Sequence, residues 1–243
     1  MENKELSEKH RLLLNLMSTF RDICDKEGIW YSLAFGSVLG AVRHNGFIPW
    51  DNDADVYIFL SDEDRFREAF FKNKPHGIML SDRYNDRRLL SSHNTLFYED
   101  GKYNRIHLDL YPIVGAPSDK KEQVKFANKN FYYEMIIKSK YVDIRKCLWK
   151  NKIFVLGSKV IDYMIPDRIL KNNIRKREQK YDYSASDYWT TLICYGGTRS
   201  CFPKRILEKR ELCQFENESF YIPSGWDEYL TILYGDYMKP VKY

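Results

Sequence analysis

The sequence predicts an α+β fold, in which helices flank a mixed β-sheet and a helical portion follows toward the C-terminus. Short apolar or alternating segments, which are typical of strands, gather in the first half of the chain. Beyond Pro117, longer segments show the helical spacing of apolar residues instead. We therefore expect a β-rich core in residues 1–117 and a helical and C-terminal portion in residues 118–243 that packs on it.

The predicted elements of the first half follow from periodicity and from residues typical of helix ends. A helix is expected over residues 6–27, with Ser7 as its N-cap and Gly28 at its end. A second helix is expected from Ser61 to about Lys72. Strands are expected at residues 29–35, 53–60, 77–82, 95–100 and 104–114.

The second half is expected to consist mainly of helices. Apolar spacing predicts them at residues 119–139, 143–163 and 167–181, with Pro166 and Asp167 at the start of the third. A hairpin is expected over residues 213–223, followed by a last helix within residues 225–239.

Composition excludes several classes of protein. Hydrophobic residues make up 44% and charged residues 30% of the chain, which is ordinary for a soluble globular protein. The net charge of +5 is too small to indicate a nucleic-acid partner, and none is expected, but it is compatible with an anionic substrate. The five cysteines include no CxxC pair, so neither a disulfide framework nor a structural zinc site is indicated, and a reducing cytoplasm is expected.

No segment predicts a membrane span, because no run of about 20 apolar residues is present. The charged N-terminus does not resemble a signal peptide. The basic helices within residues 138–180 are compatible with peripheral contact at the inner face of the cell membrane, although solvated helix faces are the simpler explanation of their charges. No oligomeric state is indicated.

Three aspartates form the central hypothesis about the site. Asp53 and Asp55 share one face of a predicted strand, and Asp109 lies within a later strand that alternates cleanly. If these strands pair, three carboxylates converge and repel one another, and a bound cation removes that repulsion. Oxygen ligands without a His or Cys cluster favour Mg²⁺, with Mn²⁺ as the alternative, over zinc.

A second group of residues is predicted to bind an anionic ligand. Gly36 and Ser37 form a turn at the start of a short helix, where backbone N–H groups favour phosphate oxygens. Arg43 and His44 are either a solvated helix end or phosphate contacts, and the sequence favours neither. Trp50 is either a packed loop anchor or a ligand contact.

At these residues the chain resembles a known family. The stretch GSVLGAVRHNGFIPWDNDADVYI (36–58) is similar to the signature of the LicD family, which is related to the fukutin domains within the nucleotidyltransferase-fold superfamily. The resemblance extends to IHLDLYPI (106–113) and to FENESFYIPSGWDEYLTILYGDYMKP (215–240). The chain departs from the family's pattern at Asn52, where another acid is usual, and at Ser37-Val38, where Thr-Leu is frequent.

The resemblance implies a catalytic core that transfers a phospho-alcohol, most commonly phosphocholine, from a CDP-activated donor. A hydroxyl of a cell-surface glycan or its lipid-linked precursor would attack the phosphorus, and CMP would leave. The family's motif makes Asp53 and Asp55 the metal pair and Asp109 a third carboxylate, which also orients or deprotonates the hydroxyl. It makes Gly36 and Ser37 the phosphate turn.

Three alternatives to phosphocholine transfer stay open. They are a CDP-glycerol or CDP-ribitol phosphotransferase, a nucleotidyltransferase that acts on a small molecule, and a binding module without catalysis. A quaternary ammonium favours an aromatic cage. The candidates for such a cage are Trp50, Tyr84, Tyr111, Trp226 and Tyr229.

Overall fold

A computed structural model describes residues 2–51, 53–73, 75–81, 83, 93–100, 106–139, 142–192 and 197–239. The described residues form two compact units. The first contains the residues up to Ser81, His93–Ile113 and those from Phe202 onward, and the second contains Arg83 and Val114–Cys201. The sequence had grouped residues 202–243 with the helical portion, whereas the structure places the described ones in the first unit, because they pack on its strands and on α2.

The first unit contains most of the strands. Its helices are α1 (Glu2–Glu27), α2 (Phe35–His44), α3 (Glu63–Lys72), α7 (Lys204–Leu207) and α8 (Trp226–Tyr234), with a 3₁₀ turn, η1 (Leu60–Asp62). Its strands are β1 (Tyr31–Leu33), β2 (Ala54–Phe59), β3 (Ile78–Leu80), β4 (Asn94–Tyr98), the first part of β5 (His107–Ala116), β7 (Phe202–Pro203), β8 (Arg210–Phe215) and β9 (Glu218–Pro223).

The sheet is mixed, as the sequence predicts. Its strands run in the order β1-β2-β5-β4-β3. The β2–β5 pair is parallel, and the β1–β2, β4–β5 and β3–β4 pairs are antiparallel. The parallel pair places β2 and β5 next to each other in the interior of the sheet, where both strands have neighbours on either side.

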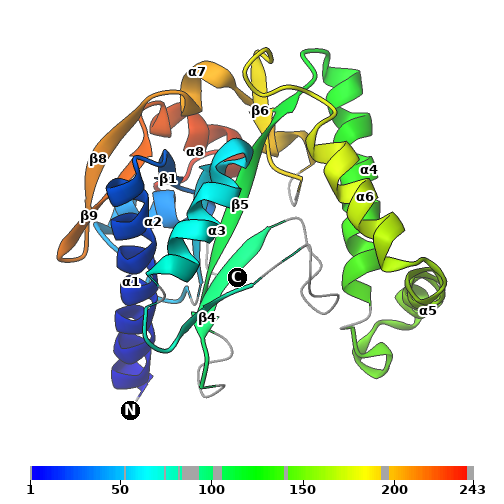
Figure 1. Cartoon of the computed structure of the whole chain (residues 1–243), viewed down its shortest axis with the longest axis horizontal. Helices are drawn as coiled ribbons and strands as arrows, with labels where there is room; N and C mark the ends of the chain where they lie inside the picture. Colours follow the sequence, from blue (N-terminus) through cyan, green and yellow to red (C-terminus); the bar gives the residue numbers. More distant parts are fainter. Residues whose placement is uncertain are drawn as a thin grey trace. The chain divides into compact units, whose positions relative to one another are not determined.

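Helix α1 covers the sheet with an apolar face. Leu13, Met17, Phe20 and Cys24 recur at helical spacing and are buried, and α1 lies beside α3 (Figure 1). The predicted end of this helix at Gly28 is confirmed, because Gly28 adopts a positive φ of 62°. The predicted start was wrong: α1 begins at Glu2 rather than after Ser7, since Glu, Lys and Leu in the preceding positions favour a helix.

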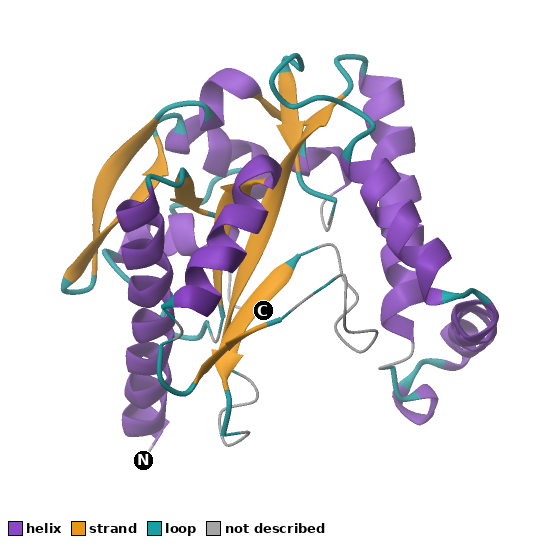
Figure 2. Ribbon diagram, in the orientation of Figure 1, coloured by secondary structure: helices purple, strands orange, loops and turns teal. Residues whose placement is uncertain are grey.

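The second unit is mainly helical (Figure 2). It comprises α4 (Lys120–Ser139), η3 (Ile144–Lys146), α5 (Trp149–Met164), α6 (Asp167–Glu178), β6 (Tyr188–Thr190) and η4 (Gly197–Ser200). The end of β5 pairs antiparallel with β6. The helix predicted over residues 143–163 begins only at Trp149, because the Asp143 side chain accepts the Arg145 backbone N–H and stabilises a 3₁₀ turn instead.

The predicted hairpin near the C-terminus is confirmed and is longer than expected. Strand β8 pairs antiparallel with β9 from Arg210 opposite Pro223 to Phe215 opposite Glu218. Arg210 fastens this hairpin to β1: its guanidinium donates to the Tyr31 carbonyl oxygen at 2.8 Å and lies 3.8 Å from the centre of the Tyr221 ring. Among the described residues, no helix is long and apolar enough to cross a membrane.

Candidate active site

Asp55 and Asp109 lie side by side at the centre of the first unit. They are partners in the parallel register of β2 and β5, and Thr95 on β4 is the partner of Asp109 on its other side. Paired residues on neighbouring strands point to the same face of a sheet, so the three side chains form a row. The pairing on which the sequence hypothesis depended is therefore present.

Asp109 is held by hydrogen-bonding groups around its carboxylate. Thr95 Oγ1 donates to Oδ1 at 2.8 Å, and Tyr111 Oη donates to Oδ2 at 3.4 Å. The Nε2 atoms of His93 and His107 lie 3.4 and 3.8 Å from Oδ2. Burial raises the pKa of Asp109, but His93, His107 and Thr95 outweigh it and lower that pKa to about 2.

The surroundings of Asp55 shift its pKa in the opposite direction. Burial, followed by the carboxylates of Asp53, Asp109 and Asp51, raises the pKa of Asp55 well above its ordinary value. The charged groups that shift this pKa are all acidic. The two neighbouring aspartates therefore differ: one is held ionised by its partners, and the other is penalised for carrying a charge.

The oxygen atoms of this pair fit a hard divalent cation. Within the described residues, no group of three or more His, Cys, Asp or Glu side chains is arranged to hold a metal ion. Mg²⁺, however, is usually bound through one or two carboxylates together with substrate phosphates. Asp55 and Asp109 supply two such carboxylates, while Asp53 precedes β2 and is exposed. A bound cation would relieve the repulsion between Asp55 and the carboxylates around it.

The turn at Gly36 and Ser37 is fastened to β2. Ser37 Oγ accepts the backbone N–H of Asp55 at 2.9 Å, and the Ala34 N–H donates to the Asp55 carbonyl oxygen at 2.9 Å. A Cβ atom at Gly36 would lie 3.1 Å from Asp51 Oδ2, so this glycine allows close approach of a further acid. The sequence hypothesis missed Asp51; the signal was its place two residues before Asp53.

A tyrosine from the C-terminal helix α8 supports the start of α2. Phe35 has a positive φ of 45°, and its backbone N–H donates to Tyr229 Oη at 2.7 Å. Tyr229 Oη also lies 3.0 Å from Tyr57 Oη, and both rings are fully buried. Tyr229, a candidate for an aromatic cage, therefore belongs to the core.

The other cage candidates are placed as follows. Tyr111 is buried with its ring against His93, and Trp226 donates its indole N–H to Glu211. Trp50 is 46% exposed. Tyr84 and the variant position Asn52 lie outside the described residues.

Arg43, His44 and Trp50 lie together, away from the phosphate turn. Arg43 and His44 end α2, whose ten residues separate them from Gly36 by about 10 Å along the helix axis. The Arg43 guanidinium donates to the Tyr237 carbonyl oxygen at 2.6 Å and to His44 Nε2 at 3.0 Å. Burial and the neighbouring Arg43 lower the pKa of His44, and the Trp50 ring lies edge-on to it.

The loop after α2 is held by the tip of the β8–β9 hairpin. Glu216 Oε1 accepts the Phe47 N–H at 3.0 Å, and the Glu216 N–H donates to the Asn45 carbonyl oxygen at 2.7 Å. A side chain at Gly46 would collide with Glu216. The C-terminal portion of the chain thus fixes both ends of α2, through Tyr229 at the start and Glu216 after the end.

Comparison with known proteins connects this geometry to a family. Residues 28–148, which include Asp55 and Asp109, match the family described as LicD/FKTN/FKRP, nucleotidyltransferase domain. The chain belongs to the LicD family. The resemblance noted in the sequence is therefore confirmed.

Relatives within and around this family differ in how much of the chain they cover. The lipopolysaccharide cholinephosphotransferase LicD of Haemophilus influenzae is 25% identical over 256 aligned positions, which cover 98% of this chain and 93% of that protein. The human ribitol 5-phosphate transferase FKRP is 29% identical over 91 residues, 37% of this chain and 18% of its own. An uncharacterized Rickettsia typhi protein, RT0683, is 40% identical over 73 residues, 30% of this chain and 24% of its own.

Proposed function

We propose that this LicD-family protein is a metal-dependent phosphotransferase. It moves a phospho-alcohol from a CDP-activated donor to a hydroxyl of a cell-surface glycan or its lipid-linked precursor. Phosphocholine is the preferred group, because the similarity to the lipopolysaccharide cholinephosphotransferase spans 98% of the chain. The similarity to the ribitol 5-phosphate transferase covers 37% of the chain and makes ribitol or glycerol phosphate the alternative.

The observation that carries the proposal is the pairing of Asp55 with Asp109. These two carboxylates would hold the divalent cation, with Asp53 next to them. The cation, Mg²⁺ in the first place, would supply positive charge to the phosphate oxygens. Asp51 adds to the negative potential around Asp55 and so to the attraction of a cation.

The reaction forms one bond to phosphorus and breaks another. The glycan hydroxyl oxygen bonds to the phosphorus that carries the alcohol, the bond from that phosphorus to the oxygen of CMP breaks, and the hydroxyl proton is released. A pKa of about 2 makes Asp109 a weak proton acceptor. We therefore assign Asp109 to binding and orienting rather than to deprotonation.

The phosphate turn is assigned to the donor. Backbone N–H groups at the start of α2 favour the donor's phosphate oxygens. Ser37 links the turn to Asp55, so the donor and the carboxylates keep a fixed separation. Arg43 donates hydrogen bonds to His44 and to the Tyr237 carbonyl oxygen. These contacts suit a role in holding the end of α2 better than direct contact with phosphate. Trp50 is exposed and is assigned to contact with the donor or the acceptor.

A donor panel tests the proposal. The purified protein is incubated with CDP-choline, CDP-ethanolamine, CDP-glycerol or CDP-ribitol, each with Mg²⁺ or with a chelator, and the nucleotide products are separated by chromatography. Magnesium-dependent CMP release, fastest with CDP-choline, supports phosphocholine transfer; fastest release from CDP-ribitol or CDP-glycerol supports the alternative. Pyrophosphate together with a nucleotidylated product from CTP would instead identify a nucleotidyltransferase.

A further inference from the structure

Helix α5 exposes an apolar face and buries a partly polar one. Its inward residues are Val155, Ser158 and Asp162, whose relative exposures are 5%, 3% and 5%. A stripe at spacings of four, three, four and four residues lies on the opposite face of the helix. This α5 stripe consists of Trp149, Ile153, Leu156, Val160 and Met164, all of them exposed.

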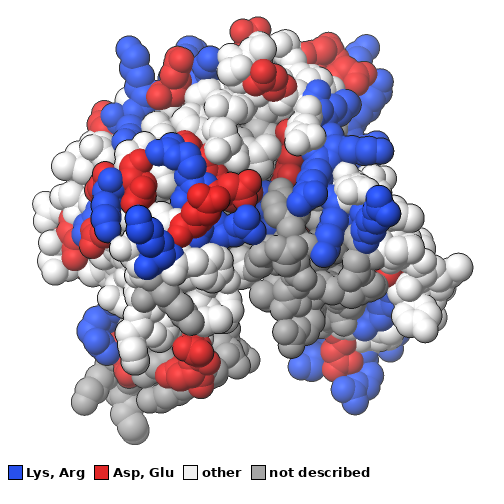
Figure 3. All heavy atoms as spheres, viewed as in Figure 1, with Lys and Arg blue, Asp and Glu red and all other residues white. Residues whose placement is uncertain are grey.

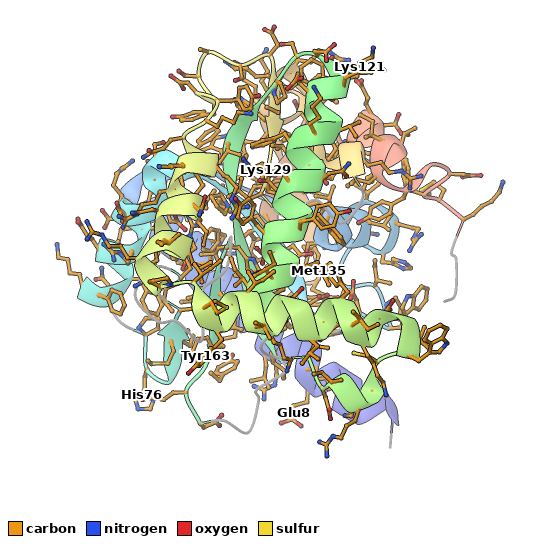
Figure 4. The ribbon with its side chains drawn as sticks, turned by 90° about the vertical axis from the view of Figure 1, so that its right-hand side faces the viewer. Glu8, His76, Lys121, Lys129, Met135 and Tyr163 are labelled. Carbon is orange, nitrogen blue, oxygen red and sulfur yellow. The ribbon has the colours of Figure 1, made fainter. Side chains whose placement is uncertain are left out.

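The orientation of the apolar stripe of α5 is the reverse of that in most surface helices. A helix on a protein surface normally turns its apolar stripe toward the core, and an exposed apolar patch of this kind marks an interaction surface. Trp149 and Ile153 are 81% and 80% exposed. In Figure 4, α5 crosses α4 near Met135 on the side that faces the viewer, with Tyr163 near one end.

The charged residues beside the α5 stripe indicate the kind of surface that it contacts. Lys152 and Lys159, seven residues apart, border one side of it, and neither is buried. Asp162, the one acid of α5, is buried on the inward face. In Figure 3, uncharged atoms cover much of the region of α5, with basic and some acidic atoms close by.

We propose that the α5 stripe binds the surface of a membrane that contains anionic lipids. Helices that lie in a membrane surface combine an apolar face bearing Trp and aliphatic side chains with basic residues along its border. Lys152 and Lys159 are placed to meet anionic headgroups while the stripe enters the acyl boundary. The 16 residues of α5 span about 24 Å, less than the ~30 Å hydrocarbon core, so the helix lies on the bilayer rather than across it.

This inference does not depend on the proposed reaction. The stripe belongs to the second unit, whereas Asp55 and Asp109 belong to the first. A second copy of the chain is a less suitable occupant, because stripe-to-stripe packing would bring the lysines of both copies together. Membrane binding and CMP release can therefore be measured separately, and either can fail without the other.

Vesicle flotation tests the inference. The full chain is mixed with vesicles of phosphatidylcholine alone or of phosphatidylcholine with phosphatidylglycerol, and the fraction that floats is measured. The protein should float with the anionic vesicles, and Ile153→Ser with Val160→Ser should reduce the partition coefficient about tenfold or more. Serine has about the helix propensity of Ile and Val, so the helix should be retained. Leu212→Ser, at a 63% exposed position on β8, is the matched control and should float like the wild type.

A charge variant separates electrostatic from apolar contributions. Lys152→Gln with Lys159→Gln should lower binding to anionic vesicles about fivefold for each charge removed. Lys120→Gln with Lys121→Gln, at exposed positions on α4, should leave it unchanged. Circular dichroism melts establish that each variant is folded.

Three results would overturn the inference. The first is a wild-type protein that stays with the unbound fraction in the presence of phosphatidylglycerol vesicles. The second is a stripe variant that floats as well as the wild type. The third is a lipid-independent dimer, seen by light scattering, that the stripe substitutions convert to a monomer while vesicle binding is absent.

Discussion

Asp55 of β2 lies directly opposite Asp109 of β5 in a parallel pair of strands. Parallel neighbours in the interior of a sheet have little freedom to move apart, so the fold itself keeps two carboxylates together. One of them has its pKa lowered to about 2 by its partners, and the other has its pKa raised by burial and by acidic neighbours. Several measurable consequences come from this difference.

The first prediction concerns the stability of the protein without metal. Asp55→Asn should raise the free energy of unfolding by about 1–2 kcal/mol in chelator, because it removes a charge that burial and three carboxylates disfavour. Urea denaturation followed by circular dichroism measures it. Glu68→Gln, at an exposed position on α3, is the control and should change stability by less than about 0.5 kcal/mol. A destabilised Asp55→Asn protein would contradict the electrostatic account.

The second prediction is the pH dependence of the same quantity. The folded protein holds the Asp55 proton more tightly than the unfolded chain does, because the folded pKa is raised. The contribution of Asp55 to stability is therefore present below the unfolded pKa of about 4 and is lost as pH rises toward the folded pKa. Denaturation series at several pH values in chelator should show a steeper decline for the wild type than for Asp55→Asn. Parallel curves would contradict this.

The third prediction concerns metal binding. Mg²⁺ should raise the melting temperature of the wild type, because a ligand that binds only the folded state stabilises it. Asp55→Asn and Asp109→Asn should each abolish most of that increase. Differential scanning fluorimetry with Mg²⁺, Mn²⁺ and chelator measures the effect. An equal Mg²⁺-dependent increase in both variants would place the cation elsewhere.

The fourth prediction concerns Thr95, whose hydroxyl donates to Asp109 Oδ1 at 2.8 Å. Thr95→Val should lower kcat about tenfold, because Asp109 loses a hydrogen bond that orients it and lowers its pKa. Thr95→Ser keeps the hydroxyl and should restore activity. The comparison of kcat and KM in the two variants separates this positioning role from general loss of structure. Equal activity in Thr95→Val and Thr95→Ser would refute it.

The fifth prediction concerns the support of α2 by α8. Tyr229→Phe removes the acceptor of the Phe35 N–H and should destabilise the protein by about 1–2 kcal/mol. Tyr57→Phe removes only the contact between the two hydroxyl groups and should cost less. Thermal melts of both variants test the order. A larger loss for Tyr57→Phe would reverse the roles assigned to them.

Periodicity predicted the elements of the site well where one face of a strand is distinct from the other. Asp109 and Leu110 alternate between a half-buried and a buried position, as the sequence indicates. In β2 the face of Tyr57 is buried too, because Tyr229 covers it from a helix 172 residues away in sequence. Spacing along the chain contains no information about such a partner.

The partners of Asp109 likewise differ in whether the sequence alone could indicate them. His107 lies two residues from Asp109 on the same strand, whereas Thr95 and His93 reach Asp109 only through the antiparallel β4–β5 register. The apolar spacing of α5 was visible in the sequence, but the direction of its stripe depends on which face packs against α4. Only the folded chain shows that the apolar face is the outer one.

The most direct test of the central claim is the rate of CMP release from CDP-choline in Mg²⁺ by the wild type, Asp55→Asn and Asp109→Asn, with circular dichroism to establish folding. We expect release by the wild type that stops in chelator, and a loss of at least about a hundredfold in each variant. Release by either folded variant at the wild-type rate would contradict the assignment of this aspartate pair as the catalytic centre.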